Sequence, residues 1–333
     1  NTAVLRPGTD GKISLRLVTP GGPGETHVAV DISGWFSTSS YGTFGSRVRP
    51  IEPTRVYDSE YARFGGTTLR DRAQVSVPIR GATDADDPSN VLVEDRPEVV
   101  GALVNVTAVN AWPNSKATYV SALPGRVPTG SDPSTSTLNL LPGQLRSNMA
   151  IVPVGADGSI NFFHLQGEIR LVVDLIGYLE QSPQDDTRAG RVIPLVAPFR
   201  AFDTREAAFN DQPLGPAQAE DFSFESFVND VAIGGDPVGD QVGLFGNLTT
   251  TNLQRQYSYA PVLSYMTAYP SPGAGSTAVP NVSNISISEG DIVPNLVLLR
   301  YGASSEGAYS VRFYNRAGYI DYLLDVYAVV LAD

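Results

Sequence analysis

Hydrophobic and polar residues alternate in short runs along the whole chain. The clearest example is residues 148–178, which read NMAIVPVGADGSINFFHLQGEIRLVVDLIGY. Three apolar runs, at 150–153, 159–164 and 169–177, are separated by turns rich in glycine, aspartate and glutamine. Glycine and aspartate tolerate the left-handed backbone of a tight reversal, which β-branched residues resist. This stretch therefore predicts three consecutive strands that form a meander.

The same pattern occurs three times. It opens the chain at Asn1 and returns near its end at Asn295, so that Asn1, Asn148 and Asn295 are evenly spaced. The period of 147 residues is far too long for a solenoid repeat and matches the length of a domain. The chain is therefore predicted to consist of tandem copies of one module.

The segments ahead of the second and third copies also match each other. RVRPIEPTRVYDS at 47–59 parallels RVIPLVAPFRAFDT at 191–204, and ALVNVT at 102–107 parallels GLFGNLT at 243–249. No window shows convincing helical periodicity, and glycine and proline punctuate runs rich in valine, isoleucine, threonine and aromatic residues. We therefore predict an all-β protein of tandem β-sandwich, jelly-roll-like domains of about 145 residues each.

Three domains follow from these matches. Residues 41–184 and 185–333 are each predicted to form a complete sandwich repeat, joined by the polar stretch 182–190. Residues 1–40 carry only the closing half of an incomplete repeat, and a lone meander is marginally stable in water. The missing half is expected either to precede Asn1 in a longer chain or to come from a neighbouring molecule. Both alternatives predict other copies or other subunits as partners in a larger assembly.

The composition argues against several kinds of partner and site. The net charge is −12, and lysine occurs only at Lys12 and Lys116, so the surface repels phosphate backbones and nucleic acid is not an expected partner. No run approaches the roughly 18 apolar residues of a membrane span, so no membrane insertion is expected. The absence of cysteine excludes disulfides and thiolate metal sites.

These motifs resemble a known family. The succession P-x-R-[VA]-[YF]-D-[ST], an N-[VL]-T strand and a closing D-[LI]-x-G-[YW] is similar to a β-domain repeated in secreted and surface proteins of actinobacteria and in minor tail proteins of their phages. The third copy departs from it, since Ala328 stands where Gly34 and Gly177 occur. The resemblance implies a noncatalytic extracellular β-sandwich and names no ligand.

Charged residues recur in the front halves. Asp58 lies near Arg55, and Asp203 lies near Arg200 at the matching position. Such a pair is either a catalytic carboxylate with a cationic partner or a structural ion pair that fixes the first strand. We favour the structural interpretation.

A second set of carboxylates recurs at the end of the last strand of each copy, at Asp31, Asp174 and Asp325. A buried aspartate that accepts backbone N–H groups is the favoured interpretation, and calcium binding is the alternative. No other cofactor or metal is expected.

Aromatic loops are the best candidates for ligand binding. Trp112 and Asn114 lie in a predicted hairpin tip, and the matching loop of the last repeat carries Arg255, Tyr257 and Tyr259. Exposed rings flanked by amides and guanidinium groups suit the face and hydroxyls of a sugar, or a protein interface. The alternative is that these rings simply cover the end of the sandwich.

The predicted function is therefore that of a non-enzymatic structural and adhesion protein, located outside the cell, on a virion or on a cell surface. A phage tail or virion surface component that contacts the host envelope is the first hypothesis. A secreted actinobacterial surface module that binds cell-envelope carbohydrate is the alternative. An enzyme is not expected, because no catalytic constellation recurs or is complete.

Overall fold

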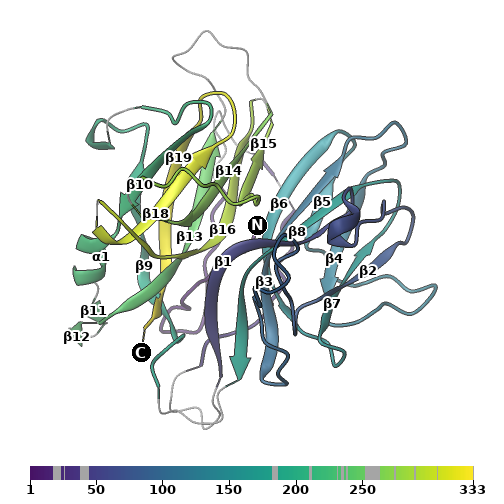
Figure 1. The fold of residues 1–333 in the computed structure, drawn as a ribbon, viewed down its shortest axis with the longest axis horizontal. Coiled ribbons are helices and arrows are strands. Elements are labelled where there is room, and N and C mark those ends of the chain that lie inside the picture. Colours follow the sequence, from purple (N-terminus) through teal and green to yellow (C-terminus); the bar gives the residue numbers. More distant parts are fainter. Residues whose placement is uncertain are drawn as a thin grey trace.

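The computed structural model describes residues 1–17, 24–25, 27–37, 45–181, 187–209, 212–230, 232–233, 236–237, 239–251, 263–273, 275–288, 290–305 and 307–332. Their regular structure is almost entirely antiparallel strand, arranged as two sandwiches side by side (Figure 1). The prediction of an all-β protein with tandem β-sandwiches is confirmed. Within the described residues no helix is long and apolar enough to cross a membrane.

The first sandwich contains two four-stranded sheets, ordered β1-β8-β3-β6 and β2-β7-β4-β5. Alternate side chains of both sheets enclose an apolar core that includes Val106, Ile160, Phe162 and Leu171. Its elements are β1 (Ser46–Asp58), η2 (Ala62–Phe64), β2 (Gln74–Pro78), β3 (Val99–Asn110), β4 (Thr118–Leu123), β5 (Leu138–Leu140), β6 (Gln144–Pro153), β7 (Ser159–His164) and β8 (Arg170–Gln181).

The second sandwich repeats this topology, with sheets β16-β13-β19-β9 and β10-β18-β14-β15, and β17 added beside β18. The short helix α1 was not predicted from the sequence. The elements are β9 (Val192–Asp203), η3 (Ala207–Phe209), β10 (Gln218–Ser223), α1 (Glu225–Asp230), β11 (Ala232–Ile233), β12 (Asp236–Pro237), β13 (Gln241–Thr251), β14 (Ser264–Pro270), β15 (Ile285–Ile287), β16 (Ile292–Arg300), β17 (Gly302–Ser304), β18 (Gly307–Asn315) and β19 (Asp321–Leu331).

The three strands predicted in residues 148–178 are present, but the prediction that they form a meander is wrong. β6 pairs with β3, β7 pairs with β2 and β4, and β8 pairs with β1 and β3, so the chain alternates between the two sheets. The turn at residues 155–158 carries the chain across the sandwich instead of along one sheet. This crossing lets the apolar sides of all three strands face one shared interior.

The prediction of three strands in residues 1–40 is not met in the part of that segment that the structure describes, because residues 1–17, 24–25 and 27–37 contain no strand. A strand needs a neighbour to satisfy its backbone and cover its apolar side. No front half pairs with this segment, and large apolar side chains such as Leu15, Ile32 and Trp35 are exposed. The assignment of residues 1–40 to an incomplete repeat stays a prediction, as do the other domain boundaries.

The two sandwiches meet through the outer faces of the sheets β1-β8-β3-β6 and β16-β13-β19-β9. Leu103, Met149 and Ile176 of the first sandwich pack in one apolar cluster with residues of the second, which include Phe245 and Leu296. All five side chains are at most 2% exposed. The central strands of these two sheets are therefore buried on both faces, once inside their own sandwich and once at this junction, which we call the seam.

Candidate functional site

A charged cluster lies at the end of β1 in the first sandwich. Arg55 Nε donates to Asp174 Oδ1 at 2.9 Å, and Arg55 Nη1 lies 3.3 Å from Asp58 Oδ2. Arg170 Nη2 donates to the same Asp58 carboxylate at 2.8 Å. Asp58 and Asp174 are 0% and 1% exposed, so the surrounding chain separates both carboxylates from solvent. The structure thus places these sequence candidates in one buried ion-pair cluster.

Asp174 also links the two sandwiches. The backbone N–H of Ser283, in the second sandwich, donates to Asp174 Oδ2 at 3.1 Å. Burial raises the pKa of the Asp174 carboxyl, and the charge and hydrogen bond of Arg55 oppose that rise. The carboxylate therefore depends on Arg55 to remain charged, and one of its oxygens is used to hold the neighbouring repeat in place.

The second sandwich carries a more exposed version of the cluster. Arg200 donates to both oxygens of Asp325, at 2.9 and 3.1 Å, and to Asp203 at 3.0 Å. Arg205 also donates to Asp203, and this hydrogen bond lowers the pKa of the Asp203 carboxyl. The third recurring carboxylate, Asp31, is exposed on the first segment of the chain. Among the described residues no group of three or more His, Cys, Asp or Glu side chains could hold a metal ion.

Ion pairs whose carboxyl group has a lowered pKa, such as that of Asp203, are expected to make the protein less stable as the pH falls. Asp221, paired with Arg312 at 2.7 Å, also has a pKa lowered by its hydrogen bond. A carboxyl with a depressed folded-state pKa contributes stability above its unfolded pKa of about 3.9 and loses it as the pH falls through the folded value. We expect the urea midpoint of the wild type to fall more steeply between pH 5 and pH 3 than that of Asp221→Asn. Equal slopes for the two proteins would show that this pair contributes nothing to acid sensitivity.

Trp112 lies in the loop of residues 111–117, between β3 and β4, and is 38% exposed. The loop is internally bonded, since Trp112 N–H donates to Ser115 Oγ at 2.8 Å and Ser115 N–H donates back to the Trp112 carbonyl at 3.0 Å. Gln166 Nε2 holds the end of the loop through the Ala117 carbonyl at 2.8 Å. Asn114 is exposed in the same loop. The loop thus presents a ring and an amide with little left to order on binding.

The other three candidates for ligand binding, Arg255, Tyr257 and Tyr259, lie outside the described residues. The structure therefore does not bring them together with Trp112 or separate them from it.

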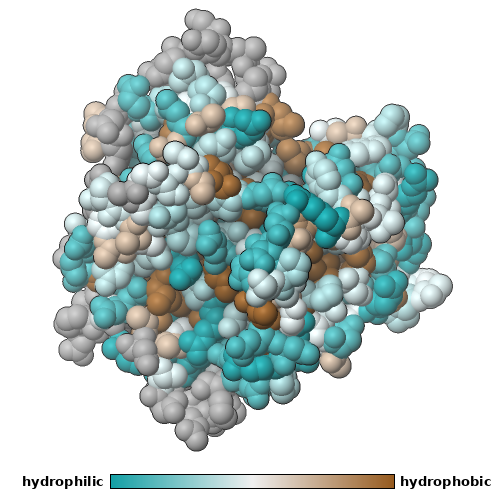
Figure 2. All heavy atoms as spheres, in the orientation of Figure 1, coloured by the Kyte–Doolittle hydropathy of each residue, from teal (hydrophilic) through white to brown (hydrophobic). Residues whose placement is uncertain are grey.

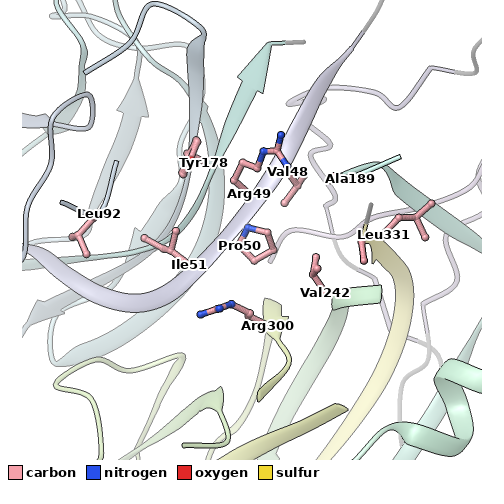
Figure 3. A pocket seen from close by; sticks show the side chains of 12 residues that line it. Val48, Arg49, Pro50, Ile51, Leu92, Tyr178, Ala189, Val242, Arg300 and Leu331 are labelled. Carbon is pink, nitrogen blue, oxygen red and sulfur yellow. The ribbon is translucent and has the colours of Figure 1, made fainter. Parts of the chain in front are cut away.

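A groove at the junction of the two sandwiches was missed by sequence reasoning (Figure 3). It has a volume of about 380 Å³ and combines apolar walls with the guanidinium groups of Arg49 and Arg300. Arg49 is paired with Glu180 at 2.8 Å, while Arg300 is exposed. Such a groove suits a small ligand with an apolar face and a negative group. Its lining is Val48, Arg49, Pro50, Ile51, Leu92, Tyr178, Ala189, Gly190, Val242, Arg300, Leu331 and Ala332.

The signal for this groove was weak in the sequence because its walls come from segments far apart in the chain. Only one hint was present, since Arg300 occupies the same place in its repeat as Arg6 does in the first copy. Apolar side chains do show among the polar ones between the two sandwiches on the face drawn in Figure 2.

No family model and no curated protein matches the chain. Among solved structures, the chain is similar to the tandem CBM22-1–CBM22-2 domain of Paenibacillus barcinonensis Xyn10C, with 10% identity, coverage of 89% of this chain and 94% of that one, and a TM-score of 0.21. It is also similar to the Broad Bean Stain Virus structure, with 8% identity, 91% and 95% coverage and a TM-score of 0.22. Scores at this level assign neither a family nor a function.

Proposed function

We propose that the protein is a non-enzymatic structural and adhesion component of an extracellular assembly, and specifically of a phage tail or virion surface that contacts the host envelope. The observation that carries the proposal is the seam. Interfaces between domains of one chain are commonly polar and allow relative motion. Here the outer faces of the two sheets that meet at the seam are apolar where they touch, with Leu103, Met149 and Phe245 fully buried.

A closed apolar seam suits a structural component, because it holds two surfaces at a fixed distance and angle. The buried Asp174 supports the same function, since its second oxygen binds a backbone N–H across the seam. The resemblance of the repeat motifs to actinobacteriophage minor tail proteins is the reason for proposing a phage tail as the assembly.

The location of the native protein tests this proposal. Particles and cell-wall material from the source culture would be separated on a density gradient, and peptides of the chain would be quantified in each fraction by mass spectrometry. Enrichment in tailed particles is the expected result. Enrichment in the cell wall alone would favour the second candidate function below, and a purely cytosolic protein would contradict both.

The second candidate function is that of a surface module that binds cell-envelope carbohydrate. The specific observation in its favour is the internally bonded loop that exposes both Trp112 and Asn114. An indole face stacks on the apolar face of a sugar ring, and a neighbouring amide can donate to and accept from its hydroxyls.

The two tryptophans of the chain provide a matched test. Trp112→Ala is expected to weaken binding of an actinobacterial envelope polysaccharide by about 30-fold, since truncating a central aromatic anchor typically costs about 2 kcal/mol. Trp35→Ala removes an indole that is 78% exposed but lies outside the loop, and should leave binding unchanged. Isothermal titration calorimetry would measure both variants. Equal affinities for the two variants would eliminate the Trp112 site.

A further inference from the structure

The first segment of the chain folds locally like the complete repeats. In the turn at residues 8–12, the Gly8 N–H donates to the Lys12 carbonyl at 2.9 Å, and the Gly11 N–H donates to the Gly8 carbonyl at 2.9 Å. The turn at residues 155–159 makes the same two bonds, at 2.8 and 3.0 Å. Each turn also has an aspartate at its third position. The Asp10 carboxylate accepts the Lys12 N–H at 3.2 Å, and the Asp157 carboxylate accepts the Ser159 N–H at 3.0 Å. Residues 8–12 are thus a structural copy of the turn between β6 and β7.

A buried asparagine joins the second sandwich to the first. Asn295, at 0% exposure, accepts the N–H of Met149 at 2.9 Å through Oδ1. Its Nδ2 donates to Asn105 Oδ1 at 2.9 Å and, within its own sandwich, to the Asn284 carbonyl at 2.7 Å. One copy therefore holds the next through the first asparagine of its pattern and the asparagine of the partner's N-x-T strand.

The first segment makes the same bonds to the second sandwich. Asn1 Oδ1 accepts the N–H of Leu296 at 3.1 Å, and Asn1 Nδ2 donates to Asn247 Oδ1 at 3.1 Å. Leu296 corresponds to Met149 in the repeat, and Asn247 corresponds to Asn105. The second sandwich contacts the first through Asn295, and the first segment contacts the second sandwich in the same way through Asn1.

The third step is half formed. The remaining asparagine of the series, Asn148, faces the first segment, where Thr2 Oγ1 lies 3.5 Å from its Oδ1 and donates to the Met149 carbonyl at 2.7 Å. Asn148 Nδ2 donates to the Thr137 carbonyl at 2.9 Å, as Asn295 does to Asn284. Among the residues that the structure describes, no N-x-T asparagine accepts from Asn148 as Asn105 accepts from Asn295.

The apolar cluster of the seam has the same threefold character. Val4, Ile151 and Leu298 occupy one position in the three copies, and all three lie in this cluster. Leu103 and Phe245, which also correspond to each other, face it from the two N-x-T strands. The three copies therefore surround a pseudo-threefold axis, with the N-terminus at the junction of the two sandwiches (Figure 1).

Core positions of the complete repeats are exposed in the first segment. Leu15 corresponds to Phe162, and the two are 64% and 0% exposed; Ile32 corresponds to Leu175, and these are 85% and 0% exposed. In the complete repeats these positions are covered by strands of the front half. The exposed apolar side chains in residues 1–17 and 27–37 therefore occupy positions that a front half buries elsewhere in the same molecule.

We propose that residues 1–17 and 27–37 belong to the closing half of a third sandwich. Their exposed apolar side chains bind the front half of a module of this type, which completes a ring of three sandwiches. The occupant is a polypeptide with the pattern of residues 45–147. It places an N-x-T asparagine against Asn148 Nδ2 and apolar strand residues over Leu15 and Ile32. A second copy of this chain is a poorer match, because each of its front halves is already closed by its own strands.

A chain extended at its N-terminus tests the proposal. Residues 45–147 would be duplicated ahead of Asn1, with the join copied from the peptide between residues 147 and 148, and hydrogen exchange would be followed by mass spectrometry. We expect amide exchange in residues 12–17 and 27–36 to slow by about 100-fold or more, because strands form there. An extension of identical composition in scrambled order is the control and should leave exchange unchanged.

Unchanged exchange in the duplicated chain, or equal slowing with the scrambled extension, would overturn the proposal. Light scattering on the unextended chain provides a second arm. A monomer with fast exchange in residues 12–36 agrees with an open face. A dimer in which these residues are already protected would show that a second copy covers the face, and would overturn the choice of occupant.

Discussion

Replacing Asn295 by alanine is expected to lower the free energy of unfolding by about 3 to 5 kcal/mol, since each buried polar group left without a partner costs about 1 to 3 kcal/mol. Three partners lose a bond: the Met149 N–H, the Asn105 carboxamide and the Asn284 carbonyl. All three bonds involve a side chain that solvent does not reach. Urea unfolding followed by circular dichroism measures the loss.

Asn1→Ala is the matched control for this prediction. Asn1 makes the corresponding bonds to Leu296 and Asn247, but its side chain is exposed and water can replace the lost bonds. Its replacement should cost about 1 kcal/mol or less. If the two variants lose the same stability, burial of the asparagine bonds is not what stabilises the seam.

Replacing Arg55 by methionine is expected to cost about 3 to 5 kcal/mol, the typical loss when one partner of a buried ion pair is removed. Asp58 keeps its bidentate bonds from Arg170, but Asp174 keeps only the N–H of Ser283. The methionine fills the space of the arginine stem, so the effect isolates the charge. Arg200→Met removes the corresponding guanidinium, which is 41% exposed, and should cost about 1 kcal/mol because solvent screens that pair.

The pH dependence distinguishes lost charge from lost packing in Arg55→Met. Without Arg55, burial and the charge of Asp58 raise the pKa of the Asp174 carboxyl further, opposed by the hydrogen bond from Ser283 N–H. A carboxyl with a folded-state pKa above its unfolded value destabilises the fold at high pH, and the penalty disappears as the pH falls through the folded pKa. The stability difference between wild type and variant should therefore shrink on acidification from pH 7 to pH 4. A constant difference would attribute the loss to packing.

The sequence predicted strands where apolar residues alternate between glycine-rich turns, and strands form there in both complete repeats. It did not predict the pairing of β6, β7 and β8, because period-two alternation indicates which face of a strand is buried but not which neighbour it bonds. The turn at residues 155–158 decides whether the chain stays in one sheet or crosses to the other. That choice depends on the closed interior of the sandwich, which a local pattern does not contain.

Candidate sites were predicted unevenly for a related reason. Arg55 and Asp58 lie three residues apart, so their proximity was visible in the sequence, whereas the link from Asp174 to Ser283 joins residues of different repeats. The recurrence of Asn1, Asn148 and Asn295 marked the start of each copy, but the sequence did not show that they bond across copies. A polar residue repeated inside an apolar strand was the available signal, since such a residue must find a partner when buried.

The asparagine contacts run in one direction around the axis, from each copy to the next, so the surfaces that meet are different ones. Contacts of this heterologous kind generate either an open filament or a closed ring, and the rotation between neighbours decides which. Two of the three contacts around the pseudo-threefold axis are formed by Asn295 and Asn1. In the ring proposed above, the third front half supplies the acceptor for Asn148, so the rotation closes after three members. A fourth module would then find no free surface in that ring.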